Sequence, residues 1–281
     1  MKVAACLKWV PLRPDIDPLT GTVETDERFS GVSAADQAAL EWALRMAVAW
    51  DAKVTVVTVG PVAAEVTLRE ALACGADAAV RVEVRAELSS IAVASELAAV
   101  LDDADVIVCG DWSLDRGSGS VPAFLAHARN AAQACGLVGI ELQSPGVIRA
   151  ERRLDGGRRE RLLVRTPAVL SIEGSTARLR RAPLAGVLAA AKATIGHRVA
   201  AIARPDGTRI TKVGPFSPRT KIVDAPVGSV RERSNALLGM GSTRTPPQRL
   251  VLEPDAAADR ILGALREWGE LERGESGESR E

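Results

Sequence analysis

Hydrophobic and polar positions follow two different periods along the first half of the chain. Short apolar runs occupy residues 2–9, 53–59, 78–84 and 105–109. Between these runs, apolar residues recur at helical spacing over residues 34–50, 66–73 and 91–101. Such runs are typical of buried parallel strands, and such spacing is typical of amphipathic helices. The alternation predicts an α/β fold built on a right-handed, doubly wound parallel sheet.

Local signals mark where these elements begin and end. Ser33 precedes the first helix and Asp36 follows it three residues later, a pattern typical of a capped helix start. Gly60 and Pro61 end the second strand, and Gly75 caps the second helix. The first two strand–helix units are therefore expected to be sharply delimited.

A different pattern begins after Gly146. Strand-like runs cover residues 147–153, 159–164 and 167–172, and Asp155-Gly156-Gly157 separates the first two. An Asp-Gly pair between strand-like runs predicts a hairpin. We expect this region to extend the sheet as an antiparallel edge.

The last third of the chain has little periodicity. Residues 196–250 are rich in proline and are expected to form an extended arm that lies across another surface. A final helix is predicted over residues 251–272, and residues 273–281 should be disordered. One face of that helix holds Ile261, Leu262, Leu265, Trp268 and Leu271. The predicted domains are thus an α/β domain of residues 1–195, the arm, the helix and the tail.

Composition excludes several classes of function. The 36 basic residues balance 36 acidic residues, and aromatic residues make up only 3% with no tyrosine, so nucleic acid is not an expected partner. No apolar run reaches the roughly 20 residues of a spanning helix, and the N-terminus lacks a signal-peptide layout, so a cytoplasmic protein is expected. Four scattered cysteines and two histidines give no metal-binding spacing.

The segments that follow the strands are the expected ligand-binding positions. In doubly wound sheets, ligands bind beyond the carboxyl ends of the strands, which points to residues 8–18, 59–61 and 110–122. The third segment, GDWSLDRGSGSVP, has three glycines and three serines and leads into a helix near Ser120 or Val121. Glycines allow close backbone approach, and helix-start amides favour phosphate. A phosphate site and a merely flexible connection remain open alternatives.

Three further segments carry a family resemblance. Residues 150–170 contain, in order, a basic residue, an acid followed by Gly-Gly, an acid, an aliphatic, then Pro and two aliphatics. Residues 57–84 contain Gly60-Pro61, Thr67 and Arg69. Residues 246–249 have the sequence Pro-Pro-Gln-Arg. Over most of residues 1–272 the chain resembles the beta subunit of electron transfer flavoprotein. Residues 113–126 are also similar to the versions of that subunit associated with mycofactocin metabolism.

The resemblance implies a redox carrier without catalytic activity of its own. It implies a heterodimer with an alpha subunit that holds most of a flavin adenine dinucleotide (FAD). The C-terminal arm of this chain would wrap around that alpha subunit. The beta chain would hold AMP or a second FAD on an adenine-nucleotide hydrolase-like sheet. Electrons would pass from a dehydrogenase to a quinone reductase or another acceptor.

The resemblance also implies positions for the site, although this chain departs from the family there. Residues 115–122 replace a run of aspartates followed by Asn-Gln-Thr-Gly, Ser33-Ala34-Ala35 replaces Asn-Pro-Phe, and Arg13 stands near the place of a usual aromatic. Partner docking is implied at Arg181 and Leu184. The implied cofactor contacts are Cys6, Ser33, Asp36, Val59, Gly60, Gly110, Asp115, Arg116, Gly117, Ser118, Gly119, Ser120 and Val121.

Each of these side chains has a plain structural alternative. Asp115 binds a ribose hydroxyl or caps its own loop, and Arg116 pairs with a phosphate or flavin ring or is a solvated cation. The Ser118 and Ser120 hydroxyls bond either a ligand or the backbone. Cys6 is expected to pack as a small apolar side chain while its backbone touches the base.

The docking residues and two other candidates carry alternatives too. Arg178, Arg180 and Arg181 are a solvated face or part of a docking loop, and Leu184 is an anchor or the first core residue of its helix. His127 has no acid or cysteine nearby in the sequence, so no catalytic role is expected, and Cys109 and Cys135 are expected to be inert. A universal-stress-type nucleotide-binding protein and a structural scaffold subunit are the rival classes.

Overall fold

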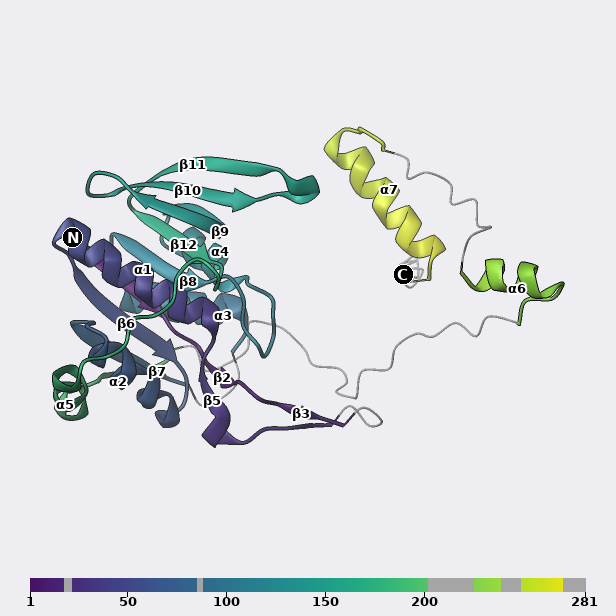
Figure 1. Cartoon of the computed structure of the whole chain (residues 1–281). Helices are drawn as coiled ribbons and strands as arrows, with labels where there is room; N and C mark the ends of the chain where they lie inside the picture. Colours follow the sequence, from purple (N-terminus) through teal and green to yellow (C-terminus); the bar gives the residue numbers. More distant parts are fainter. Residues whose placement is uncertain (18–21, 85–87, 202–224, 239–248, 270–281) are drawn as a thin grey trace, which may run out of the picture. The chain divides into compact units, whose positions relative to one another are not determined.

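The computed structural model describes residues 1–17, 22–84, 88–201, 225–238 and 249–269 (Figure 1). Two compact units divide the chain, Met1–Ser217 and Pro218–Glu281. The described part of the second unit contains α6 (Val230–Leu237) and α7 (Pro254–Glu267). Within the described residues, no helix is long and apolar enough to cross a membrane.

A large sheet forms the centre of the first unit. Its strand order over the described residues is β11-β10-β9-β12-β8-β1-β6-β7-β13. The strands are β1 (Lys2–Cys6), β6 (Lys53–Val59), β7 (Ala78–Glu83), β8 (Val106–Gly110), β9 (Ala132–Leu142), β10 (Val147–Arg153), β11 (Arg159–Arg165), β12 (Ala168–Ile172) and β13 (Gly196–Val199). Neighbours from β9 to β13 through β12, β8, β1, β6 and β7 are parallel, which confirms the doubly wound α/β fold.

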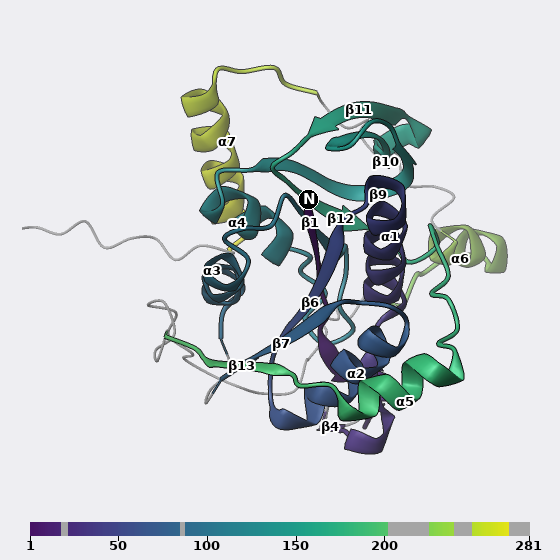
Figure 2. The same cartoon turned by 90° about the vertical axis from the view of Figure 1, so that its left-hand side faces the viewer.

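Helices cover both faces of this sheet (Figure 2). The helices are α1 (Ala34–Trp50), α2 (Glu65–Ala73), α3 (Ser90–Val100), α4 (Val121–Ala128) and α5 (Leu184–Lys192). Along β1, Val3 and Ala5 pack in the core beneath α1, whereas Ala4 and Cys6 face the core beneath α3 and α4. Strands that are buried on both faces explain why their sequences are almost continuously apolar.

The first strand is shorter than predicted. It ends at Cys6, although the Leu7 N–H still donates to the Val57 carbonyl of β6. From Lys8 onward the chain leaves the sheet to form β2 (Trp9–Pro11), which pairs with β5 (Ser30–Val32). The departure has a local cause, because the backbone N–H of Lys8 donates to the buried Asp36 carboxylate instead of to a neighbouring strand. A second small pair, β3 (Asp15–Ile16) with β4 (Val23–Glu24), follows.

The region after Gly146 confirms one prediction and corrects another. The hairpin of β10 and β11 is antiparallel and extends the sheet at its edge, as predicted. The third run of that region was wrongly grouped with the edge, because β12 lies between β8 and β9 and is parallel to both. All five of its residues are buried, as in a central strand. Strand β9, which carries Gly136, Gly139, Gln133 and Glu141, was not predicted.

The C-terminal predictions fall partly outside the described residues. Residues 196–199, the start of the predicted arm, form β13 beside β7 at the sheet edge. The predicted final helix is present as α7, whereas α6, which begins with a capping box at Ser229 and Glu232, was not predicted. Most of the arm, Leu271 and the predicted tail lie outside the described residues.

Candidate functional site

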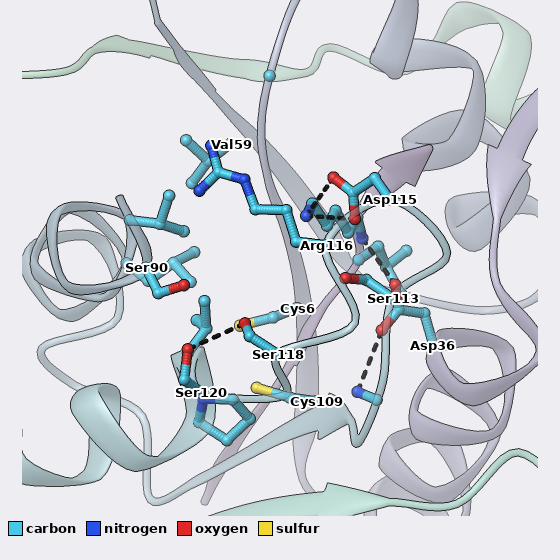
Figure 3. Close-up of a pocket in the computed structure, with 18 of the residues that line it drawn as sticks. Cys6, Asp36, Val59, Ser90, Cys109, Ser113, Asp115, Arg116, Ser118 and Ser120 are labelled. Atoms are coloured by element: carbon cyan, nitrogen blue, oxygen red, sulfur yellow. Dashed lines mark hydrogen bonds and ion pairs between the residues drawn. The ribbon is translucent and has the colours of Figure 1, made fainter. Parts of the chain in front are cut away.

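A cavity of about 280 Å³ opens where the parallel strands end. Its walls come from the segments after β1, β6, β7 and β8 and from the starts of α3 and α4 (Figure 3). This is the position at which doubly wound sheets bind ligands, because the loops at the carboxyl ends of adjacent strands converge there.

The floor of the cavity is apolar. Val57, Val59, Val93 and Leu97 contribute aliphatic surface. Cys6 and Cys109 stand opposite each other on neighbouring parallel strands and also line the cavity. The hydrogen bond with Cys6 and burial raise the pKa of the Cys109 thiol well above its ordinary value. That thiol is therefore neutral near pH 7.

Asp36 joins two of the segments that form the cavity. Its carboxylate oxygens accept hydrogen bonds from the backbone N–H of Lys8 at 2.9 Å and of Gly110 at 3.1 Å. A Cβ at Gly110 would overlap Oδ1 of Asp36, so only glycine permits this contact. Burial raises the pKa of Asp36 to about 7, and the two backbone hydrogen bonds oppose that rise.

Ser33 positions Asp36 from the start of α1. Its hydroxyl accepts a hydrogen bond from the Asp36 backbone N–H at 3.2 Å, which is the predicted helix cap. The Ser33 side chain is buried and does not line the cavity. Because it caps the helix, Ser33 fixes the register from which the Asp36 carboxylate reaches Lys8 and Gly110.

The loop after β8 is held at both sides of the cavity. Lys8 Nζ lies 2.7 Å from a carboxylate oxygen of Asp115, and Arg116 Nη1 donates to the Leu88 carbonyl at 2.8 Å. Burial alone would raise the pKa of Asp115, but hydrogen bonds from Lys8 and Ser113 hold it below its ordinary value. Asp115 is therefore ionised at neutral pH and forms an ion pair with Lys8.

Two glycines give this loop its path. Gly117 and Gly119 have φ angles of +62° and +57°, in the left-handed region that favours glycine. A Cβ at Gly119 would also overlap the Asp111 carbonyl oxygen. The loop backbone consequently passes close to its own earlier turn and leaves the cavity open.

The loop delivers two hydroxyls and a helix start to the cavity. Ser118 Oγ and Ser120 Oγ lie 3.1 Å apart and both residues line the cavity (Figure 3). Ser120 is the N-cap of α4, and its side chain makes no capping hydrogen bond to the helix. The first N–H groups of a helix have no partner within the helix, and here Val121 and Ala123 carry such groups while Pro122 has none. The two hydroxyls therefore lie at the same end of the cavity as this helix start.

A second exposed feature lies on α5, which packs against α2. Arg69 on α2 donates to the carbonyl oxygens of Ala190 at 2.9 Å and Ala193 at 3.1 Å, at the C-terminal end of α5. Before α5, Arg180 forms a bidentate ion pair with the buried Glu41 carboxylate on α1. Both ends of α5 are thus attached to the domain while Leu184 remains 74% exposed.

Comparison with known proteins places this architecture in a family. A family model described as electron transfer flavoprotein domain matches residues 20–202. The chain belongs to the electron transfer flavoprotein family. It is 33% identical over 177 residues to electron transfer flavoprotein subunit beta of Thermoanaerobacterium thermosaccharolyticum, a match that covers 61% of this chain and 67% of that relative.

Two other relatives agree with this assignment. The chain is 30% identical over 176 residues to electron transfer flavoprotein subunit beta of Dictyostelium discoideum, covering 62% of this chain and 70% of that relative. It is 28% identical over 209 residues to protein FixA of Azorhizobium caulinodans, covering 69% and 74%. The resemblance to the beta subunit of electron transfer flavoprotein is confirmed.

In this electron transfer flavoprotein chain, most of the predicted cofactor contacts surround one cavity. Ser33 and Gly117 do not line the cavity. Ser33 caps α1, and Gly117 allows the loop after β8 to turn at a positive φ angle. The predicted residues that line the cavity are Cys6, Asp36, Val59, Gly60, Gly110, Asp115, Arg116, Ser118, Gly119, Ser120 and Val121.

Several residues of the cavity were not predicted from the sequence. Lys8 and Trp112 lie within the segments predicted to bind a ligand, so their positions in those loops were the available signal. Leu88 lies between β7 and α3, and Val93 lies on α3; neither position was among the segments predicted to bind a ligand. Nothing in their sequence context distinguishes them from ordinary core residues.

The structure decides one of the alternatives near the predicted docking residues. The hypothesis that Leu184 is a core residue is wrong for this chain, because its side chain is 74% exposed. The two alternatives for Arg180, a solvated face and part of a docking loop, both stay open, because its side chain pairs with Glu41 while 39% of it remains exposed. Arg181 is exposed, and its predicted part in docking stays a prediction.

Proposed function

We propose that this chain is the beta subunit of a heterodimeric electron transfer flavoprotein. The heterodimer would carry electrons from a dehydrogenase to a quinone reductase or another acceptor, with FAD shared with an alpha subunit. The family match and the similarity to beta subunits support this role. In this function the chain binds cofactors and partners and has no catalytic reaction of its own.

We also propose that the cavity at the carboxyl ends of β1, β6 and β8 holds an adenine nucleotide. The observation that carries this proposal is the pairing of an apolar floor with a glycine-shaped loop that ends at the start of α4. An apolar floor suits a base, and hydroxyls with helix-start amides suit a phosphate. AMP and the adenylate part of a second FAD both fit this description.

The residues divide the work of binding as follows. Val57, Val59 and Leu97 would contact the base, and the Ser118 and Ser120 hydroxyls would donate to phosphate oxygens. Asp36 acts by positioning, because both of its oxygens already accept backbone hydrogen bonds. A flavin bound at the partner interface supplies the electron-accepting chemistry, whereas the residues of this cavity only bind and orient.

Substitution of Gly119 tests the nucleotide site. Gly119→Ala forces a Cβ against the Asp111 carbonyl oxygen at a positive φ, so the loop must move and the bound nucleotide should be lost. Gly156→Ala is the matched control, because Gly156 has a similar φ of +69° with nothing within 4 Å of its Cβ position. Nucleotide content is measured by mass spectrometry after denaturation.

The two variants give opposite expectations. Gly156→Ala should keep the nucleotide content of the wild-type protein, while Gly119→Ala should lose it and melt at a lower temperature, because a ligand that binds only the folded state stabilises it. Retention of the wild-type nucleotide content by Gly119→Ala would show that this loop is not the binding site.

We further propose that Leu184 docks the electron-donating dehydrogenase, with Arg181 beside it. An exposed aliphatic side chain on a helix that is attached at both ends can become a binding hot spot when a partner buries it, whereas nearby arginines act mainly on encounter rate and orientation. The rival function, a universal-stress-type nucleotide-binding protein, would need neither an alpha subunit nor a flavin.

A further inference from the structure

Trp112 is an aromatic side chain at the rim of the cavity. It stands on the loop after β8, lines the cavity and is 49% exposed. Among the described residues that line the cavity it is the one aromatic side chain. A half-exposed tryptophan beside an apolar cavity leaves a large planar surface in contact with water, which a ligand ring can cover.

The polar edge of this indole also differs from that of two other tryptophans in the first unit. Trp42 Nε1 donates to Thr176 Oγ1 at 3.2 Å, and Trp50 Nε1 donates to the Gln143 carbonyl at 3.4 Å. Trp112 Nε1 has no acceptor among the described residues. The indole N–H of Trp112 is therefore available to water or to a ligand.

The loop backbone leaves room for the indole. The position of a Cβ at Gly117 lies 2.9 Å from Trp112 Nε1, so the absence of a side chain at Gly117 allows the indole edge to rest against the loop. The Asp111 N–H donates to the Ile172 carbonyl at 3.1 Å, and the Gly117 N–H donates to the Ser113 carbonyl at 3.0 Å. These bonds fix the backbone on both sides of Trp112.

We propose that Trp112 is a specificity-determining residue whose indole stacks on the purine ring of the nucleotide in this cavity. This inference rests on the proposed nucleotide site and adds the contact that recognises the base. The aliphatic floor can cover one face of a planar ring, and Trp112 is the side chain that can offer an aromatic surface to it. Serines and helix-start amides remain for the phosphate.

The test compares a ligand that contains the ring with one that lacks it. Binding of AMP, FAD and ribose 5-phosphate to the nucleotide-stripped full chain is measured by calorimetry for the wild type, Trp112→Ala and Trp112→Phe. Trp268→Ala is the control variant, because Trp268 is exposed and belongs to the second unit. Melting temperatures show whether each variant is folded.

The proposal expects a ring-dependent loss of affinity. Trp112→Ala should weaken AMP binding by about 5- to 150-fold, the range of measured base-stacking contributions, and should weaken FAD binding similarly through its adenine. Trp112→Phe should lose less, and Trp268→Ala should bind as the wild type does. The affinity for ribose 5-phosphate should be the same in all four proteins, because this ligand has no base.

Four results would overturn the proposal. Wild-type affinity for both AMP and FAD in Trp112→Ala would show that the indole does not contact the base and belongs instead to a protein interface. An equal loss for AMP and ribose 5-phosphate would show that the substitution damages the phosphate loop. A loss for FAD alone would assign Trp112 to the flavin ring. If the wild-type chain binds neither nucleotide, the proposed nucleotide site falls first and this inference falls with it.

Discussion

Asp36 shows how a single buried carboxylate can hold two segments of a site together. Its oxygens hold the backbone after β1 and the end of β8 together through Lys8 and Gly110. Burial in this position raises the pKa of Asp36 to about 7, so the carboxyl binds a proton more readily in the folded protein than in the unfolded chain. Protonation of this carboxyl is therefore linked to folding.

Asp36 should make the folded protein less stable as the pH rises. Its pKa is raised above the ordinary 3.8, so the folded state holds a proton between about pH 4 and pH 7 that the unfolded state has lost. Stability from this group is full below that window and is lost as the pH rises through it. Asp36→Asn cannot ionise and should lack this loss.

Chemical denaturation at about pH 5 and about pH 8 measures the effect. From the lower to the higher pH, the unfolding free energy of the wild type should fall relative to that of Asp36→Asn by about 1 to 3 kcal/mol, since one pKa unit corresponds to about 1.4 kcal/mol. Asp111, whose pKa burial also raises, is present in both proteins and cancels in the comparison. Parallel pH dependences would contradict the assignment of this titration to Asp36.

At this scale, the sequence predicted the loop better than it predicted the individual contacts. Ser118, Gly119 and Ser120 were found because glycines and hydroxyls before a helix have a known chemistry. Trp112 and Lys8 were missed because their roles depend on where the loop after β8 and the segment after β1 meet. Only the three-dimensional arrangement brings those two segments together.

Helix α5 shows how an exposed element is held in place. Arg69 binds its C-terminal carbonyl groups, and the ion pair of Arg180 with Glu41 fixes the segment before it. Burial tends to raise the pKa of Glu41, but hydrogen bonds from Arg180 and Arg45 lower it below its ordinary value. The carboxylate is therefore charged at neutral pH, and Leu184 is displayed from a fixed position.

Leu184→Ala should separate docking from stability. The side chain is 74% exposed, so the substitution should change the unfolding free energy by less than about 0.5 kcal/mol. If Leu184 docks the donor, its removal should weaken donor binding by about 1 to 3 kcal/mol while the flavin content stays unchanged. Stability is measured by denaturation, and donor binding by the donor concentration that half-saturates flavin reduction.

Val48→Ala provides the control for this experiment. Val48 is 79% exposed on α1, and its truncation should change neither stability nor donor binding. Wild-type donor dependence in Leu184→Ala would remove this residue from the proposed docking site.

The elements themselves were predictable to different degrees. Helix α1 and strand β6 combine clear periodicity with strong end signals, and both appear as predicted. Strand β12 was placed at the wrong position in the sheet, because an apolar run predicts a strand without naming its neighbours. Strand β9 was missed because Gly136, Gly139 and exposed polar residues interrupt its apolar pattern.

The features of the whole chain fit the role of one subunit of an electron carrier. Its cavity lies at the carboxyl ends of the strands, and exposed apolar side chains such as Leu184 on α5 are suited to partners. The family match and the beta-subunit relatives agree with a subunit that has both features. The predicted domain boundaries and the partner-wrapping role of residues 196–250 remain predictions.

Mass spectrometry of the cofactors released after coexpression with the alpha subunit tests the central claim most directly. We predict a yellow heterodimer that releases FAD together with a second adenine nucleotide, either AMP or further FAD, whereas the chain purified alone should retain no flavin. A heterodimer that releases only the FAD of its alpha subunit would contradict the nucleotide site. A chain that forms no flavin-containing complex and instead purifies alone with bound ATP would contradict the account as a whole.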